Sequence, residues 1–321
     1  MKILLTHSPE AMANYYGDRA LSALKQAGEV ILNNKSHSLE GQELIAAAKD
    51  CDLIVSYRQS PGPAELFERL PKLIAFLRCA IDIRNVDVAA ASKAGVLVTQ
   101  ASAGFVTSVS ELVFGFMIDL ARGVNPATHL YHHNRVPPAR MGRELKGSTI
   151  GVIGHGQIGR EVVRLAEAFG MRVLINDPYA SNAKTVPLEQ LLSQSDFVVP
   201  LATATEETEN LIDAAALAKM KKGAFLINVS RGNLVDEQAL EAALKSGHLG
   251  GCAMDVGRAP DQMPMLPLAA RPDVIATPHI AGLTVPAIEH QSMETVAQAG
   301  EIVKGKAPKG AVNAEHWKRK P

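Results

Sequence analysis

The stretch that decides the fold begins at residue 149 and reads Thr149-Ile150-Gly151-Val152-Ile153, then Gly154-His155-Gly156-Gln157-Ile158-Gly159. One helix length later it continues as Val173-Leu174-Ile175-Asn176-Asp177. The apolar run at 149–153 predicts a buried strand. Glycines at 154, 156 and 159 suit a tight turn, close approach of a pyrophosphate and close helix packing, with the helix N-terminus facing the phosphates. The pattern predicts a dinucleotide-binding turn whose contacts come from Gly154, Gly156, Gln157, Ile158 and Gly159.

Asp177 decides which dinucleotide we expect. It ends the second predicted strand, where a carboxylate can accept hydrogen bonds from the adenosine ribose. Its charge would also repel a 2′-phosphate. We therefore expect NAD rather than NADP as the cofactor.

Composition narrows the class of protein. The chain has 321 residues, so two domains are the default expectation. Lys and Arg total 33, Asp and Glu total 33, and no long block of like charge argues for nucleic acid. Three widely separated cysteines make a disulfide framework improbable, and no apolar run is long enough for a signal peptide or a membrane span. These features favour a cytoplasmic protein with reduced thiols.

Apolar runs alternate with helical patterns along the whole chain, which is typical of an α/β fold with parallel sheets. The strands predicted in the first part are 2–6, 29–32, 53–56, 73–77 and 96–99. Those predicted in the second part are 149–153, 172–175, 197–199, 224–229, 251–256 and 274–276. Helices are expected between them, including 15–27 and a long apolar helix at 108–122.

The segment 125–144 has no clear helical or strand pattern, and we expect it to wrap an interface or a domain surface. The apolar helix at 108–122 is the feature that favours a homodimer. The segment contains His129, His132 and His133 at helical offsets, which a metal could use. No fourth ligand is nearby and hydride transfer to NAD needs no metal, so we expect none.

Three ordered motifs resemble the D-isomer-specific 2-hydroxyacid dehydrogenases over nearly the whole chain. They are the turn 154–159 with Asp177-Pro178-Tyr179, the stretch 222–232 reading KGAFLINVSRG, and the stretch 276–282 reading ATPHIAG. The resemblance implies a Rossmann-type cofactor domain inserted into a smaller flavodoxin-like α/β substrate domain. It places the substrate domain at 1–98 plus 283–321 and the NAD-binding domain at 99–282.

Arg231 and His279 are the candidate catalytic residues. Both follow predicted strands, at the end where α/β sheets place ligands. The planar guanidinium suits a carboxylate and the neighbouring carbonyl oxygen of a 2-oxo acid, and an imidazole can give or take a proton near neutral pH. A surface ion pair is the alternative for the arginine. The resemblance places Val229, Ser230 and Asp255 beside the cofactor, although Asp255 could instead cap the following loop.

One residue of the family pattern is missing. The family carries a glutamate in a Glu-Pro pair after the Asp-Val dipeptide, where it bonds the histidine, but this chain has Pro260 at that place. The nearest carboxylate is Asp261. Either Asp261 replaces the glutamate through a shifted loop, or His279 works unassisted, or turnover has been lost.

The substrate loop departs from the family as well. In place of a glycine-rich turn, the chain reads Arg78-Cys79-Ala80-Ile81-Asp82, which leaves Ala80, Ile81 and Asp82 as candidate substrate contacts. Asp82 could accept hydrogen bonds from substrate hydroxyls or could cap a helix. Arg58 follows another strand and either enters the site or is solvated.

These observations predict an oxidoreductase that transfers a hydride between NAD(H) and C2 of a D-2-hydroxy acid or 2-oxo acid. Arg231 would anchor the substrate, His279 would act as acid and base, and domain closure would exclude water. The alternative is a dinucleotide-sensing binding protein with vestigial catalysis, which the missing glutamate favours. Neither reading requires a nucleic acid or a membrane as a partner.

Overall fold

The computed structural model describes residues 1–181 and 183–321 and divides them into two compact units. The first unit comprises Met1–Phe105 and Leu283–Pro321, and the second comprises Val106–Gly282. The first boundary therefore falls after residue 105 and not after residue 98 as predicted. The reason is the strand Leu97–Gln100, which pairs along its whole length with the strand Ala75–Arg78 of the first unit.

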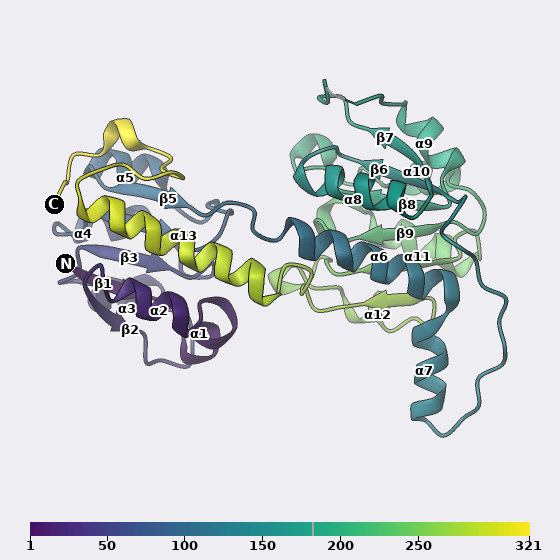
Figure 1. Ribbon diagram of the computed structural model, residues 1–321, viewed down its shortest axis with the longest axis horizontal. Helices are drawn as coiled ribbons and strands as arrows, with labels where there is room; N and C mark the ends of the chain where they lie inside the picture. The colour runs from purple at the N-terminus through teal and green to yellow at the C-terminus, as the bar shows by residue number, and fades with distance from the viewer. Residues whose placement is uncertain (182) are drawn as a thin grey trace. The chain divides into compact units, whose positions relative to one another are not determined.

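The first unit is built on a parallel sheet of five strands in the order β2-β1-β3-β4-β5 (Figure 1). This is the flavodoxin-like strand order. The strands are β1 Lys2–Leu5, β2 Glu29–Leu32, β3 Leu53–Ser56, β4 Ala75–Arg78 and β5 Leu97–Gln100. The helices are α1 Pro9–Tyr15, α2 Asp18–Leu24, α3 Gly41–Ala48, α4 Ala64–Arg69, α5 Val88–Ala94 and α13 Val285–Val303, with a 3-10 turn η4 at Ala314–His316.

Alternation along the strands explains why helices cover both faces of this sheet. Leu4, Ile54 and Phe76 belong to the cluster that includes buried residues of α3, α4 and α5. Their neighbours Leu5 and Val55 belong to the other cluster, with residues of α2 and α13. A strand that is buried on both faces needs apolar side chains at every position. That requirement produced the continuous apolar runs from which these strands were predicted.

The second unit contains a parallel sheet of six strands in the order β11-β10-β9-β8-β6-β7. The strands are β6 Thr149–Ile153, β7 Arg172–Asn176, β8 Phe197–Pro200, β9 Phe225–Asn228, β10 Gly251–Met254 and β11 Val274–Ala276. The helices are α6 Val106–Arg122, α7 Val124–His132, α8 Gln157–Ala168, α9 Leu188–Gln194, α10 Ala214–Lys219, α11 Glu237–Lys245 and α12 Leu266–Ala269. The 3-10 turns are η1 Glu206–Thr208, η2 Gly232–Leu234 and η3 Pro260–Gln262.

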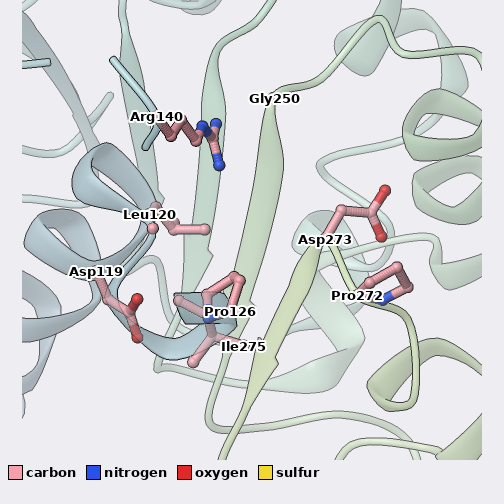
Figure 2. Close-up of a pocket in the computed structure, with 9 residues that line it drawn as sticks. Asp119, Leu120, Pro126, Arg140, Gly250, Pro272, Asp273 and Ile275 are labelled. Atoms are coloured by element: carbon pink, nitrogen blue, oxygen red, sulfur yellow. The ribbon is translucent and has the colours of Figure 1, made fainter. Parts of the chain in front are cut away.

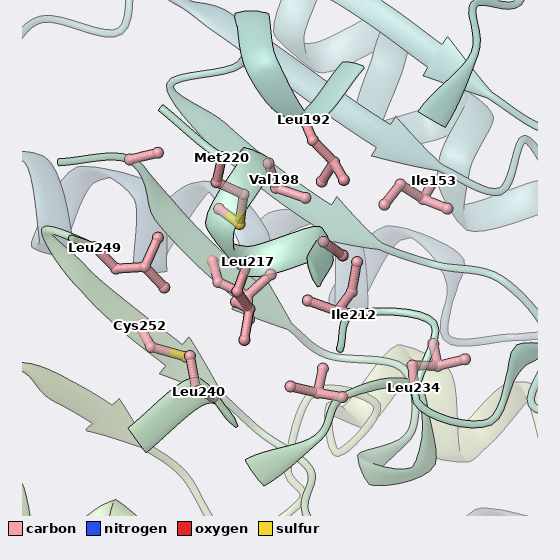
Figure 3. Close-up of a cluster of buried hydrophobic side chains, with 14 of the residues drawn as sticks. Ile153, Leu192, Val198, Ile212, Leu217, Met220, Leu234, Leu240, Leu249 and Cys252 are labelled. Atoms are coloured by element: carbon pink, nitrogen blue, oxygen red, sulfur yellow. The ribbon is translucent and has the colours of Figure 1, made fainter. Parts of the chain in front are cut away.

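Two layers of helices cover this second sheet. Helices α6 and α8 pack against each other and on the strands of one face. Figure 3 shows the core on the other face, where Leu192, Leu217 and Leu240 of α9, α10 and α11 meet Val198 and Cys252 of the strands. Strand order reverses between β6 and β8, and ligands of such sheets bind beyond the carboxyl ends of the strands at that reversal.

The segment after α6 differs from the sequence prediction. Residues 124–132 form helix α7, although no residue of this helix is buried. The sequence did not predict this helix, because helices are recognised by the periodic apolar residues of a buried face and α7 has no buried face. No helix within the described residues is long and apolar enough to cross a membrane.

Candidate functional site

The dinucleotide turn has the geometry that its glycines predicted. Gly154 has a φ of +99°, a conformation that side chains with a Cβ rarely adopt. A Cβ on Gly159 would lie 2.1 Å from the carbonyl oxygen of Gly154, whereas a Cβ on Gly156 would meet nothing within 4 Å. Gly154 and Gly159 are therefore required by the turn itself. The space beside Gly156, at the N-terminus of α8, suits a pyrophosphate.

Asp177 is tied to the same turn. Its Oδ2 accepts a hydrogen bond from the backbone amide of His155 at 2.7 Å, and its Oδ1 accepts one from the amide of Tyr179 at 2.8 Å. The bond from His155 is the largest cause of a lowered pKa at this carboxyl group. Asp177 is thus an ionised acceptor at the carboxyl end of β7, where the adenosine ribose of a dinucleotide lies.

Arg231 follows strand β9 in a turn that Asn228 organises. Asn228 is 1% exposed, accepts from the amide of Ser230 and donates to the carbonyl oxygen of Arg231 at 2.9 Å. The guanidinium itself donates to the carbonyl oxygen of Ser230 at 2.8 Å. A buried amide that uses both its donor and its acceptor leaves this turn little freedom.

Asp255, at the end of β10, holds the loop that carries His279. Its fully buried carboxylate accepts from the Thr277 hydroxyl at 2.6 Å and from the amides of Ile280 and Ala281 at 2.8 Å each. The amide of His279 donates to the backbone oxygen of Asp255 at 3.0 Å. These contacts fit the second role considered for Asp255, in which it caps the loop. They allow His279 a φ of +56°, a strained value for a non-glycine residue.

The imidazole of His279 contacts Asp261, but through the main chain. Nδ1 of His279 lies 2.8 Å from the backbone carbonyl oxygen of Asp261. Because a carbonyl can only accept, this bond requires the proton on Nδ1 and leaves Nε2 for another partner. Asp261 was predicted to act through its carboxylate, and the described bond uses a different group of the same residue.

Three candidate residues of the second unit thus share one edge of one sheet. Arg231, Asp255 and His279 follow β9, β10 and β11, which are neighbours, and the dinucleotide turn follows β6 at the same edge. Val229 and Ser230 lie in the turn after β9. The arrangement combines a cation, an imidazole and a dinucleotide turn.

The remaining candidates lie in the first unit, also beyond strand ends. Arg58 follows β3, and its guanidinium carbon lies 5.2 Å from the centre of the Tyr15 ring. Asp82 pairs with Arg84, whose Nε lies 3.0 Å from each carboxylate oxygen. The backbone oxygen of Ala80 accepts from Ala101 at 3.0 Å, and Ile81 is half-buried.

Sequence reasoning missed a buried arginine that organises this end of the first sheet. Arg78 is 1% exposed, and its Nη1 donates to the carbonyl oxygens of Tyr57 and Ser60 and to the hydroxyl of Ser56. Its Nε donates to the carbonyl oxygen of Asp82 at 3.1 Å. Burial lowers the pKa of Arg78 to about 10. Its position at the end of an apolar strand was the one available signal.

His7, directly after β1, is the second residue that was missed. Its ring lies 5.0 Å from the rings of both Tyr16 and Tyr57, and the residue is 2% exposed. Neither ring nitrogen has a hydrogen-bond partner among the described residues. Burial, followed by the charge of Arg78, lowers the pKa of His7 to about 3.

Arg258 is the third, in the loop after β10. Its guanidinium donates to Glu209 at 2.8 Å and to the side-chain oxygen of Asn210 at 2.6 Å, and also to the carbonyl oxygens of Asn233 and Val235. A charged residue in a polar loop looks solvated in a sequence, so no signal marked it.

Figure 2 shows a pocket elsewhere in the second unit. It is lined by Leu120, Pro126, Arg140, Asp273 and Ile275, among others. Gly250 and Asp273 precede β10 and β11, so this pocket lies at the amino ends of those strands, away from His279. In the described part of the chain, no cluster of three His, Cys, Asp or Glu side chains could hold a metal ion.

The fold and the glycine turn define a doubly wound α/β protein with a dinucleotide-binding domain. Residues 114–281 match the profile of the D-isomer specific 2-hydroxyacid dehydrogenase, NAD binding domain. The chain belongs to this family, and NAD is its cofactor. The glycine turn and Asp177 fit that cofactor.

Individual relatives agree with the family. A glyoxylate reductase of Korarchaeum cryptofilum is 33% identical over 95% of both chains. A D-3-phosphoglycerate dehydrogenase of Methanocaldococcus jannaschii is 33% identical over 92% of this chain, which spans 57% of that protein. The solved structure of an Aquifex aeolicus D-lactate dehydrogenase with NAD and lactic acid has a TM-score of 0.78 and 26% identity, covering 98% of this chain and 97% of that one. The comparisons support NAD-linked D-2-hydroxyacid dehydrogenase activity in general and do not favour the binding-protein alternative.

Proposed function

We propose that the protein reduces a small 2-oxo acid with NADH, and oxidises the corresponding D-2-hydroxy acid with NAD, by means of Arg231 and His279. The observation that carries this proposal is that Arg231 follows β9 and His279 follows β11, the two strands on either side of β10, at the sheet edge that also holds the dinucleotide turn. A carboxylate anchor and a proton donor are the two groups that this reduction needs from the protein.

Each residue has one task in the reduction. NADH supplies the hydride that adds to C2. The guanidinium of Arg231 binds the substrate carboxylate and the C2 oxygen with its parallel donors and stabilises the charge that develops there. His279 gives that oxygen a proton from Nε2, while Nδ1 stays bonded to the Asp261 carbonyl oxygen. In the oxidation, Nε2 takes the proton back.

The first substrates to test come from the relatives. One is named for glyoxylate and another for D-3-phosphoglycerate, while a solved neighbour binds lactic acid. A panel of glyoxylate, pyruvate, hydroxypyruvate and 3-phosphohydroxypyruvate is suitable, with the loss of NADH absorbance as the measurement. An active 2-oxo acid supports the proposal, and inactivity of the whole panel and of longer 2-oxo acids contradicts it.

Arg231→Lys tests the anchor. Lysine keeps the charge but loses the two-point contact, so kcat/KM for the best oxo acid is expected to fall by about 100-fold or more. The dissociation constant of NADH, measured by fluorescence titration, is expected to change by less than about twofold because Arg231 has no assigned contact with the nucleotide. Arg69→Met is the control, since this arginine is an exposed partner of Glu65 in α4 of the first unit. Wild-type kcat/KM in Arg231→Lys would remove the assignment.

We also propose that two copies of the chain associate. The support lies in α7 and the following segment, where Tyr131 is 61%, Val136 85% and Met141 95% exposed. Exposed apolar side chains in one segment are typical of an interface. Analytical ultracentrifugation tests this, and a monomer at micromolar concentration contradicts it.

A further inference from the structure

The loop that replaces the missing glutamate has an unusual construction. It runs from Gly257 to Met263 and is closed by backbone bonds from Gly257 to Gln262 at 2.8 Å and from Ala259 to Met263 at 3.0 Å. Pro260, which occupies the glutamate position, begins its single 3-10 turn. The loop thus places a main-chain oxygen, that of Asp261, against Nδ1 of His279.

We infer that this carbonyl oxygen takes the place of the family's glutamate, and that Arg258 is the positioning residue that holds it there. The inference rests on the proposed function for its catalytic consequence. A carbonyl oxygen fixes the ring orientation and the tautomer, as a carboxylate would. It brings no negative charge to the imidazole.

Arg258 connects this loop to the rest of the second unit. Its guanidinium is bonded to Glu209, whose second oxygen accepts from Asn233 at 3.0 Å. Its backbone amide donates to Glu237 at 3.1 Å. Side-chain and main-chain bonds from this one residue to five partners fix the loop at its base, two residues before Pro260 starts the 3-10 turn.

The same loop is locked against the Arg231 turn. A Cβ on Gly232 would lie 2.2 Å from the backbone oxygen of Gly257, and a Cβ on Gly257 would lie 2.6 Å from Cα of Pro264. These backbones touch with no side chain between them. The turn that carries Arg231 and the loop 257–263 that contacts His279 therefore form one packed block.

Backbone strain is concentrated in this block. Five described residues other than glycine have a positive φ, and four of them belong here, namely Asn210, Asp261, Gln262 and His279, with values from 52° to 58°. Residues persist in this region only when their surroundings determine them, and such strain clusters at functional sites. Asn210 is itself a direct partner of Arg258.

The first experiment measures the tautomer of His279 by nitrogen-15 NMR of histidine-labelled protein, with a His279→Gln variant to assign its signals. We expect the neutral ring to carry its proton on Nδ1. Asp261→Gly removes the carboxylate, keeps the carbonyl and tolerates the positive φ, so the Nδ1–H tautomer is expected to remain. A proton on Nε2, or a change of tautomer in Asp261→Gly, would overturn the inference.

The second experiment compares Arg258→Met with Arg69→Met, which also removes an arginine bonded to one glutamate and one side-chain amide. In Arg258→Met we expect the single tautomer of His279 to be lost and kcat to fall by about 10- to 100-fold. The dissociation constant of NADH should stay within about twofold because the dinucleotide turn is untouched. A retained tautomer with kcat equal to that of Arg69→Met would overturn the role of Arg258.

A milder variant keeps the test decisive if Arg258→Met does not fold. Glu209→Gln keeps the shape of the partner but removes its charge, and a fall in kcat of about threefold is expected with the same NADH affinity. No change relative to Arg69→Met would then count against the positioning role. The two proposals fail separately, because a wild-type protein that reduces no oxo acid contradicts the function while the NMR result still decides the carbonyl contact.

Discussion

The carboxyl ends of the two parallel sheets are organised by side chains of opposite charge. In the second unit, the carboxylate of Asp177 accepts from backbone N–H groups of the loops after β6 and β7, and that of Asp255 accepts from backbone N–H groups of the loop after β11. In the first unit, the guanidinium of Arg78 collects backbone carbonyl oxygens of the loops that follow β3 and β4. A functional loop can thus be fixed through the N–H groups or through the carbonyl oxygens of its peptides, and the buried centres are Asp255 in the second unit and Arg78 in the first.

The two solutions leave different groups for chemistry. A carboxylate centre consumes amide donors, so the loop after β11 offers the side chain of His279 as its functional group. An arginine centre consumes carbonyl oxygens, and it also brings a positive charge under the loop that replaces the glycine-rich turn. Each centre is costly to remove, because its partners would be left unpaired inside the protein.

Asp255→Ala, which removes the buried carboxylate of the second unit, should have the largest effect on stability. The Thr277 hydroxyl and the amides of Ile280 and Ala281 would lose their buried acceptor, so the free energy of unfolding is expected to fall by about 3–5 kcal/mol. Urea denaturation measures it. Asp213→Ala is the matched control, since this aspartate caps α10 through a single bond to Ala216 and is expected to cost about 1 kcal/mol. Equal losses in the two variants would show that Asp255 is not a structural centre.

Arg78→Met should lower the free energy of unfolding by less than Asp255→Ala does. The carbonyl oxygens of Tyr57, Ser60 and Asp82 would lose a donor, while methionine fills much of the space, so a loss of about 2–3 kcal/mol is expected. Arg69→Met, at an exposed ion pair, is expected to cost less than about 1 kcal/mol. If urea denaturation gave the same value for both arginines, the contrast between the two sheets would lose its basis.

His7→Phe sharpens the comparison through pH. The folded-state pKa of His7 is lowered to about 3, so the unfolded chain binds a proton first as the pH falls below about 6.5. The wild type therefore loses stability over this range, by about 1 kcal/mol between pH 7.5 and pH 6.0. The phenylalanine variant should lack this loss. Urea midpoints at the two pH values measure it, and parallel changes in both proteins would contradict the assignment of a buried neutral imidazole.

Much of this architecture could be predicted from the sequence for a physical reason. Strands buried on both faces are mostly apolar, so the buried strands β3 and β6 were predicted to the residue. The turn at 154–159 was also predictable, because only glycine fits its positive φ and its close contact. Exposed α7 offered no such pattern.

The parts that escaped prediction depend on main-chain atoms. The partner of His279 is a carbonyl oxygen, and every residue has one, so no residue type could mark it. Arg78 and Arg258 bond mainly to carbonyl oxygens or to residues far away in the chain, such as Glu209. The sequence pointed to Asp261 as the residue that contacts His279. It suggested the carboxylate because residue types differ in their side chains and not in their carbonyl groups.

Four left-handed residues also bear on heat resistance. They are His279 itself, Asp261 and Gln262 in the loop that contacts it, and Asn210, which bonds to Arg258. Each non-glycine residue in this conformation costs on the order of 1 kcal/mol, against a total stability of about 5–15 kcal/mol for a typical domain. The protein therefore gives up part of its thermal tolerance to keep the imidazole and its carbonyl partner in place. Directed evolution toward longer survival at high temperature is expected to relax this loop first, and the resulting variants should show slower turnover at moderate temperature.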